Sequence, residues 1–168
     1  VTSRWIRCAL ASPIAKCIIK SGINVMSPLK NRSSQTVERA KKYGIEDSIS
    51  LENSIINSDL IISILVPDAA EDLAKEVSNL SKKLDKEIIF ADLNAISPET
   101  VKKMNSSMSG TKVKFIDGGI IGGPPEGDKM PRIYVSGQNS NLFSRLDGLG
   151  MKVIDMNGSV GDASAMKM

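Results

Sequence analysis

The sequence feature that most constrains the fold is a nearly continuous apolar run from Asp59 to Val66. A run of this kind is typical of a central parallel strand that helices bury on both faces. The run ends at Pro67-Asp68, and the segment after it repeats apolar residues at helical spacing, namely Leu73, Val77, Leu80 and Leu84. Short apolar runs and amphipathic stretches alternate in this way along the chain. We therefore predict an α/β fold with a doubly wound, mostly parallel sheet.

Other segments fit the same pattern. Ser97 and Pro98 suit the N-cap and the first position of a helix, and Gly44 suits the end of a helix over residues 36–43. Further strands are predicted over residues 23–26, 87–91, 112–116, 132–135 and 151–156, and further helices over residues 140–149 and 161–168. The glycine- and proline-rich stretch 117–131 is expected to form a loop between two of these strands.

Composition excludes several classes of protein. The chain has 168 residues, 41% hydrophobic and 24% charged, which is typical of one globular domain. Its net charge of +3 is spread along the sequence, so no nucleic-acid partner is expected. The absence of histidine excludes Ser-His and Cys-His catalysis and argues against a metal site. No apolar stretch approaches the ~20 residues that span a bilayer. With two cysteines, we expect a reduced, cytoplasmic protein without a membrane partner.

The candidate ligand site lies at the predicted strand ends. In an open α/β sheet, ligands bind beyond the carboxyl ends of the strands, which points to residues 65–67, 92–94 and 117–125. The last segment reads D-G-G-I-I-G-G-P-P, and its glycines expose backbone N–H groups and let a ligand approach the main chain. The alternative interpretation is a mobile surface loop with turn glycines.

Lys167 is a candidate catalytic residue. The small residues Gly161, Ala163, Ser164 and Ala165 before it allow a helix to pack closely. A lysine on such a helix can donate a proton to a substrate oxygen if it is partly desolvated. The alternative is that Lys167 is an ordinary solvated surface residue.

Asn31-Arg32-Ser33 follows the strand predicted over residues 23–26. At this position a dinucleotide fold reads the adenosine ribose, and an arginine can hold the 2′-phosphate of NADP. Arg32 and the serine hydroxyls suit a phosphate. The alternative is that Ser33 or Ser34 caps the next helix, and both interpretations can hold at once.

Taken in order, these segments resemble the N-terminal, Rossmann-type NAD(P)-binding domains of the β-hydroxyacid dehydrogenases. The resemblance is to the 6-phosphogluconate dehydrogenase-like and 3-hydroxyisobutyrate dehydrogenase-like members, and it runs from about Ala11 to Met168. The matching motifs are Asn31-Arg32-Ser33, Leu65-Val66-Pro67, Asp92-Leu93-Asn94 with Ser97-Pro98, Asp117 with Gly122-Gly123, and Gly161 with Lys167.

The resemblance implies roles on the cofactor side. NADP is the implied cofactor, with NAD as an alternative. Leu65, Val66 and Pro67 would line it, and Asn94 would lie near its nicotinamide end.

It also implies roles on the side of a small-molecule substrate. Gly122 and Gly123 would hold a substrate carboxylate through their backbone, and Lys167 would give or take the hydroxyl proton. Ile121 stands where the family commonly has serine, which removes a hydroxyl donor. Residues 1–160 would form the cofactor domain, and residues 161–168 would start the interdomain helix. We expect these 168 residues to lack the family's helical C-terminal domain, and a homodimer is expected only with that domain.

The largest departure from the family lies at the start of the chain. A Rossmann domain begins with an apolar strand and a G-x-G-x-x-G/A loop for the pyrophosphate, but no glycine precedes Gly22 here. Codons for Arg4-Trp5-Ile6-Arg7-Cys8-Ala9 exist that, read one base later, give Gly-Gly-Phe-Gly-Ala. Our hypothesis is that residues 1–9 are an out-of-frame reading of this loop.

The sequence thus predicts an oxidoreductase that transfers a hydride between NADP(H) and a hydroxyacid-like substrate. The alternative is a non-catalytic nucleotide-binding module or an inactive, truncated remnant, which the atypical phosphate loop and the short C-terminus would favour.

Overall fold

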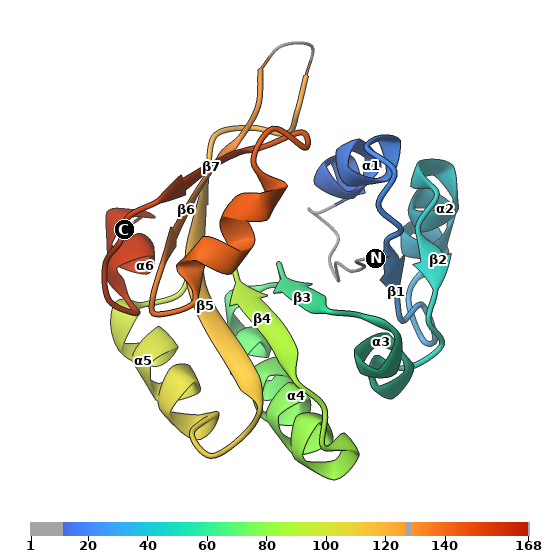
Figure 1. Ribbon diagram of the computed structural model, residues 1–168. Coiled ribbons are helices and arrows are strands. Elements are labelled where there is room, and N and C mark those ends of the chain that lie inside the picture. The colour runs from blue at the N-terminus through green and yellow to red at the C-terminus, as the bar shows by residue number, and fades with distance from the viewer. Residues whose placement is uncertain (1–11, 127–128, 168) are drawn as a thin grey trace.

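The computed structural model describes residues 12–126 and 129–167, which form an α/β fold with a mostly parallel central sheet (Figure 1). The strands are β1 (Met26–Ser27), β2 (Glu46–Asp47), β3 (Leu60–Ser63), β4 (Ile88–Asp92), β5 (Val113–Ile121), β6 (Arg132–Ser136) and β7 (Lys152–Asp155). The helices are α1 (Ser12–Lys20), α2 (Ser34–Tyr43), α3 (Leu51–Asn57), α4 (Ala70–Leu84), α5 (Pro98–Ser107) and α6 (Asp162–Lys167), with 3-10 turns η1 (Pro67–Ala69) and η2 (Ser140–Leu146). The predicted Rossmann-type fold class is confirmed.

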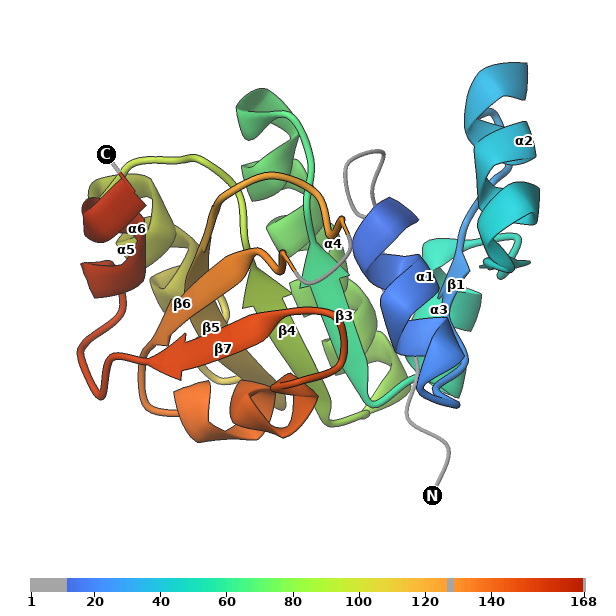
Figure 2. The same ribbon diagram turned by 90° about the horizontal axis from the view of Figure 1, so that it is seen from above.

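The strands form two sheets. The larger has the order β3-β4-β5-β6-β7, and β3, β4 and β5 run parallel. Strand β6 pairs antiparallel with β5, and β7 runs parallel to β6. The smaller sheet is the parallel pair β1-β2, which lies with α2 on the side of the molecule away from β6, β7 and α6 (Figures 1 and 2).

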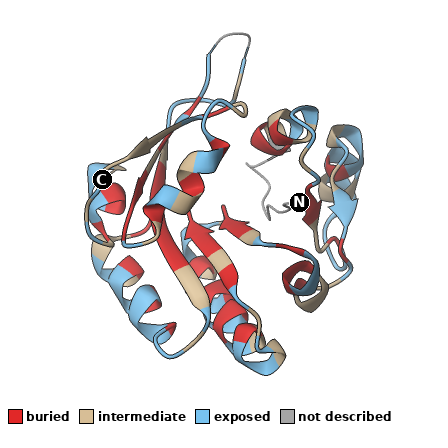
Figure 3. Cartoon of the chain, viewed as in Figure 1, coloured by how far each residue is buried: buried red, intermediate tan, exposed pale blue. Residues whose placement is uncertain are grey.

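Helices cover the larger sheet on both faces, and each face has its own apolar core. Ile62 belongs to the core that includes Ile14 of α1 and Phe143 of η2. Its neighbour Ile61 belongs to the core that includes Val77 of α4 and Val101 of α5. Consecutive side chains of a strand point to opposite faces. Buried residues accordingly make up most of β3, β4, β5 and β6, whereas the residues of β7 are half-buried or exposed (Figure 3).

Several local predictions are confirmed, and each has a clear physical cause. Ser97 caps α5 by accepting a hydrogen bond from the Thr100 N–H at 3.1 Å, and Pro98 is the first helical residue. Gly44 ends α2 with a φ of +76°, a left-handed conformation that glycine adopts without strain. The apolar stripe predicted after Pro67 is α4, whose Leu73 and Val77 are buried.

The loop expected over 117–131 is wrong in its first five residues. Residues 117–121 belong to β5 and pair with β6, from Asp117 opposite Ser136 to Ile121 opposite Arg132. Gly118 and Gly119 are therefore strand residues. A Cβ on Gly118 would collide with the side chain of Leu93, which follows β4, and would lie 3.2 Å from the Tyr134 carbonyl oxygen of β6. Close packing, rather than a turn, therefore requires glycine there.

Other boundaries also differ from the predictions. The apolar run 59–66 is a strand only over Leu60–Ser63. Among the described strands, this strand, β3, is an edge strand of the larger sheet and not a central one. The helix expected over 140–149 is the shorter η2. Helix α3 was not predicted, although Ser50 caps it by accepting a hydrogen bond from Asn53 N–H at 3.1 Å.

Candidate functional site

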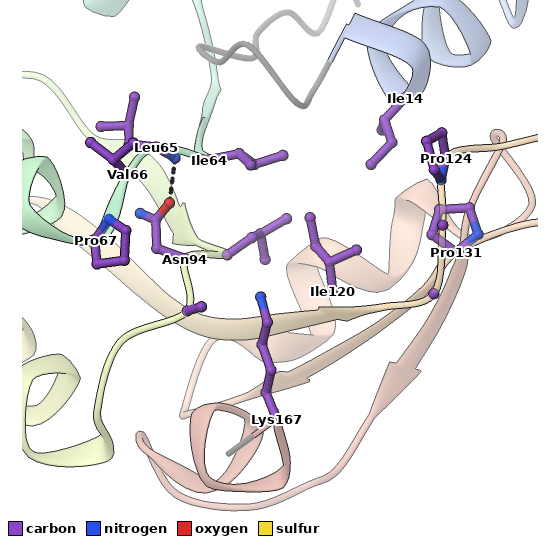
Figure 4. Close-up of a pocket in the computed structure, with 14 residues that line it drawn as sticks. Ile14, Ile64, Leu65, Val66, Pro67, Asn94, Ile120, Pro124, Pro131 and Lys167 are labelled. Atoms are coloured by element: carbon purple, nitrogen blue, oxygen red, sulfur yellow. Dashed lines mark hydrogen bonds between the residues drawn. The ribbon is translucent and has the colours of Figure 1, made fainter.

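A pocket of about 400 Å³ lies at the carboxyl ends of β3 and β4, between α1, the end of β5 and α6 (Figure 4). It brings together seven residues expected from the sequence, namely Leu65, Val66, Pro67, Asn94, Gly122, Gly123 and Lys167. The remaining lining is apolar and consists of Ile14, Ile64, Leu93, Ala95, Ile120, Pro124 and Pro131. Small-molecule and cofactor sites commonly combine such an apolar lining with a few polar groups.

Lys167 enters this pocket from the last position of α6, and Figure 4 shows its amine pointing between Asn94 and Ile120. Its aliphatic chain lies over Gly119, because a Cβ on Gly119 would be 3.5 Å from Lys167 Cβ and 3.1 Å from the Ala163 carbonyl oxygen. Burial lowers the pKa of Lys167, whereas the negative charge of Asp92 acts to raise it. A half-buried amine in an apolar pocket is suited to proton transfer.

Asn94 is buried, and its amide is bound mainly within the protein. Its Nδ2 donates to Ser63 Oγ at 2.7 Å and to Asp92 Oδ1 at 2.6 Å. Its Oδ1 accepts a hydrogen bond from the Leu65 N–H (Figure 4). Asn94 therefore fixes the backbone at the end of β3 and keeps one Oδ1 lone pair for a ligand.

Asp92 is fully buried beside Asn94 and carries a perturbed carboxyl group. Burial raises its pKa to about 6, hydrogen bonds from Ser63 and Asn94 oppose the rise, and the charge of Asp117 adds to it. This carboxyl group can therefore gain a proton in mildly acidic solution.

Asp117 binds the first turn of α6. One carboxylate oxygen accepts hydrogen bonds from Gly161 N–H at 2.8 Å, Ser164 N–H at 3.2 Å and Ser136 Oγ at 3.0 Å. The other accepts a hydrogen bond from Ser164 Oγ at 2.6 Å. These bonds join α6, which carries Lys167, to β5.

The expected adenosine-side residues lie elsewhere, in the turn between β1 and α2. Asn31 has a φ of +63°, and Arg32 is exposed. Ser33 is the N-cap of α2 and accepts a hydrogen bond from Thr36 N–H at 3.3 Å, as the alternative interpretation predicts. None of these three residues lines the pocket.

Ile121 does not line the pocket either, although Ile120 does. The two residues alternate along β5, so their side chains point to opposite faces. The sequence reasoning missed Ile120 because it treated this segment as a loop.

Sequence reasoning also assigned no role to the side chains of Ser63, Asp92 and Asp117. One signal could have identified them: Ser63 interrupts the apolar run 60–66, and Asp92 and Asp117 each follow directly after an apolar run. A polar side chain at such a position is buried with partners or faces a ligand.

The hypothesis about residues 1–9 falls on a segment outside the described residues. Within residues 12–126 and 129–167, no cluster of three or more side chains has the composition of a metal site. No helix in this part of the chain has the length and apolar character to cross a membrane.

Comparisons with known proteins agree with the geometry. An uncharacterised 28.5 kDa protein of Methanothermus fervidus is 32% identical over 149 residues, which are 89% of this chain and 55% of that protein. The mitochondrial 3-hydroxyisobutyrate dehydrogenase of Drosophila melanogaster is 30% identical over 101 residues, 58% of this chain and 31% of the enzyme.

A solved structure of a conserved protein of unknown function, described as similar to 3-hydroxyacid dehydrogenases, superimposes with a TM-score of 0.85 at 28% identity. The match covers 99% of this chain and 62% of that one, so the chain spans less than two thirds of the length of each of these relatives. The family model for the NAD-binding domain of 6-phosphogluconate dehydrogenase matches residues 10–154. The Rossmann-type sheet, the pocket at its carboxyl edge and this match together show that the chain belongs to the family of 6-phosphogluconate dehydrogenase NAD-binding domains.

Proposed function

We propose that this chain is the cofactor domain of a dehydrogenase that transfers a hydride between NADP(H) and a hydroxyacid-like substrate. The observation that carries the proposal is the position of Lys167, whose amine enters an apolar pocket at the carboxyl edge of a dinucleotide-binding sheet. An isolated surface lysine would have no such surroundings.

The described residues fit the nicotinamide half of the cofactor. Ile14, Ile64 and Leu93 offer an apolar surface for a flat ring, and Asn94 Oδ1 keeps a lone pair for a donor on the ligand. When bound, the cofactor supplies or accepts the hydride. The pyrophosphate contacts expected of this fold would involve residues before Ser12, outside the described part of the chain.

The role proposed for Lys167 is proton transfer. In the direction of reduction, its ammonium donates a proton to the substrate carbonyl oxygen as the carbonyl carbon gains the hydride. In the direction of oxidation, the neutral amine takes the proton from the hydroxyl group. Burial lowers the pKa of Lys167 and so brings the two forms closer in free energy.

Lys167→Ala tests this role in the full reading frame that contains residues 1–168. We expect kcat to fall by about 10²–10⁴-fold, the usual contribution of a general acid or base. The affinity for NADPH, measured by fluorescence titration, should change little. Lys152→Ala, which removes an exposed lysine of β7, is the matched control. Unchanged turnover of hydroxyacids by Lys167→Ala would refute the role of Lys167, and no hydride transfer by the unmodified protein would refute the enzyme function.

The preference for NADP is proposed to depend on Arg32. Its exposed guanidinium follows β1, where the fold reads the adenosine ribose. Arg32→Ala should weaken NADPH binding by about tenfold, as for one lost charge-assisted hydrogen bond, and NADH binding much less. Equal losses for both cofactors would show that Arg32 does not bind the 2′-phosphate.

The domain boundary, location and assembly belong to the same proposal. Residues 1–160 would form the cofactor domain, and α6 would lead toward a substrate-side domain. The whole protein would be a cytoplasmic homodimer that forms through that second domain.

A further inference from the structure

Four buried polar side chains lie side by side across the larger sheet. Ser63 of β3 is opposite Asp92 of β4, Asp92 is opposite Asp117 of β5, and Asp117 is opposite Ser136 of β6. All four residues are fully buried. We refer to Ser63, Asp92, Asp117 and Ser136 as the polar row.

Burying a row of polar side chains destabilises the folded state unless each group has hydrogen-bond partners. The strands lie about 4.8 Å apart, so the carboxyl groups of Asp92 and Asp117 are neighbours in a buried environment. Two adjacent buried carboxylates do not both ionise readily. Asp117 receives four hydrogen bonds, and the pKa of Asp92 is raised mainly by burial and further by the charge of Asp117.

Each carboxyl group binds a different wall of the pocket. Asp92 accepts hydrogen bonds from the Asn94 side chain at 2.6 Å and from the Asn94 backbone at 3.3 Å. Asn94 in turn accepts from the Leu65 N–H, so Asp92 holds the wall at the ends of β3 and β4. Asp117 holds Gly161 and Ser164 of the opposite wall, which carries Lys167.

We propose that Asp92 and Asp117 are positioning residues that hold the two walls of this pocket separately, Asp92 the cofactor wall and Asp117 the Lys167 wall. Their importance for hydride transfer rests on the proposed function. Neither residue lines the pocket, so each acts through a residue that does. Loss of Asp92 should disturb cofactor binding, and loss of Asp117 should disturb the placement of the proton donor.

The experiment compares Asp92→Asn with Asp117→Asn in the full reading frame. Each substitution keeps the shape of the side chain but replaces one acceptor oxygen with an NH₂ group. Amide hydrogen exchange of the cofactor-free protein, resolved by NMR, measures each wall without any turnover. Asp92→Asn should accelerate exchange of the Leu65 amide by about tenfold and leave the Gly161 and Ser164 amides nearly unchanged. Asp117→Asn should produce the reverse pattern.

Ser136→Ala is the matched control for the second wall. Ser136 Oγ accepts from the Ala163 N–H at 3.0 Å, so its loss should accelerate exchange at Ala163 and not at Leu65. Equal acceleration at both walls in either aspartate variant, or no acceleration, would overturn the proposal. A general loss of stability would also raise exchange at the β4 amides, which report on the core of the sheet.

Kinetics and binding then test the consequence for function. Asp92→Asn should weaken NADPH binding several-fold and, because the charge of Asp92 raises the pKa of Lys167, should shift the pH profile of kcat to lower pH with little loss of maximal kcat. Asp117→Asn should instead lower maximal kcat with a smaller effect on NADPH binding. The opposite split would overturn the assignment of the walls. If the unmodified protein neither binds NADPH nor turns over substrate, the proposed function fails, and the exchange pattern alone decides the positioning proposal.

Discussion

The two sheets of the molecule hold their parts of the proposed cofactor site in different ways. The β1-β2 pair has two residues in each strand, and both residues of β2 are exposed. Strands β4 and β5 pair over five residues, and Ile88, Phe90, Ala91 and Asp92 of β4 are almost fully buried. The smaller sheet therefore depends on loop contacts, such as the Leu29 N–H to Asp47 Oδ1 hydrogen bond of 3.0 Å.

This difference matches the work proposed for each sheet. Binding a phosphate at an exposed turn needs charge and little rigidity, whereas proton transfer needs a donor held in a fixed position. The larger sheet supplies that fixed position through the polar row and α6. We therefore expect the larger sheet to dominate the stability of the fold and the smaller sheet to affect mainly affinity.

The largest expected loss of stability comes from Phe90→Ala. Phe90 is fully buried in β4, with its ring centroid 6.0 Å from that of Phe115. Removal of a buried aromatic ring should lower the free energy of unfolding by about 3–5 kcal/mol, measured by urea denaturation. Ile56→Ala, at a side chain that is 49% exposed, should cost far less. Similar losses for the two variants would contradict a core centred on the larger sheet.

The pH dependence of stability tests the burial of Asp92. Its pKa of about 6 in the folded state lies above the ordinary value of 3.8, so protonation favours folding. The resulting stability is fully present below about pH 4 and is lost as pH rises through 6. Between pH 4 and pH 7, the titration of Asp92 should lower the free energy of unfolding of the wild type by roughly 3 kcal/mol. The Asp92→Asn variant should not show this decrease.

Urea unfolding at several pH values measures this difference between the wild type and Asp92→Asn. Asp68→Asn, at an exposed carboxyl group, is the control and should follow the wild type. If Asp92→Asn also follows the wild type over this range, Asp92 does not titrate as its burial requires.

The smallest expected effects come from two helix caps, one next to each sheet. Ser97→Ala removes the cap of α5, which packs on the larger sheet, and should cost about 1 kcal/mol. Ser33→Ala removes the exposed cap of α2, whose hydrogen bond is longer at 3.3 Å, and should cost less, about 0.5 kcal/mol. Denaturant midpoints of the two variants measure both values. A larger loss of stability for Ser33→Ala would contradict the expectation that the larger sheet contributes more to the stability of the fold.

Local sequence signals predicted much of the fold because their causes are local. The cap at Ser97, the stop at Gly44 and the apolar stripe of α4 each depend on a few neighbouring residues. The same signals failed at Gly118 and Gly119, where close packing requires glycine: Gly118 packs against Leu93 and β6, and Gly119 packs against α6. Local sequence signals also failed to predict α3, because this short helix lacks a long periodic stripe of apolar residues.

The sequence by itself determined the α/β class, the family resemblance and the strand-end residues that line the pocket, because periodicity and motif order are properties of the chain. Only the tertiary structure decided that the segment from Asp117 to Ile121 is a strand, that Ile120 rather than Ile121 lines the pocket, and that Asp92 and Asp117 are neighbours. The physical reason is strand register. Residues 25 positions apart become adjacent only when backbone hydrogen bonds align two strands, and no local pattern encodes that alignment.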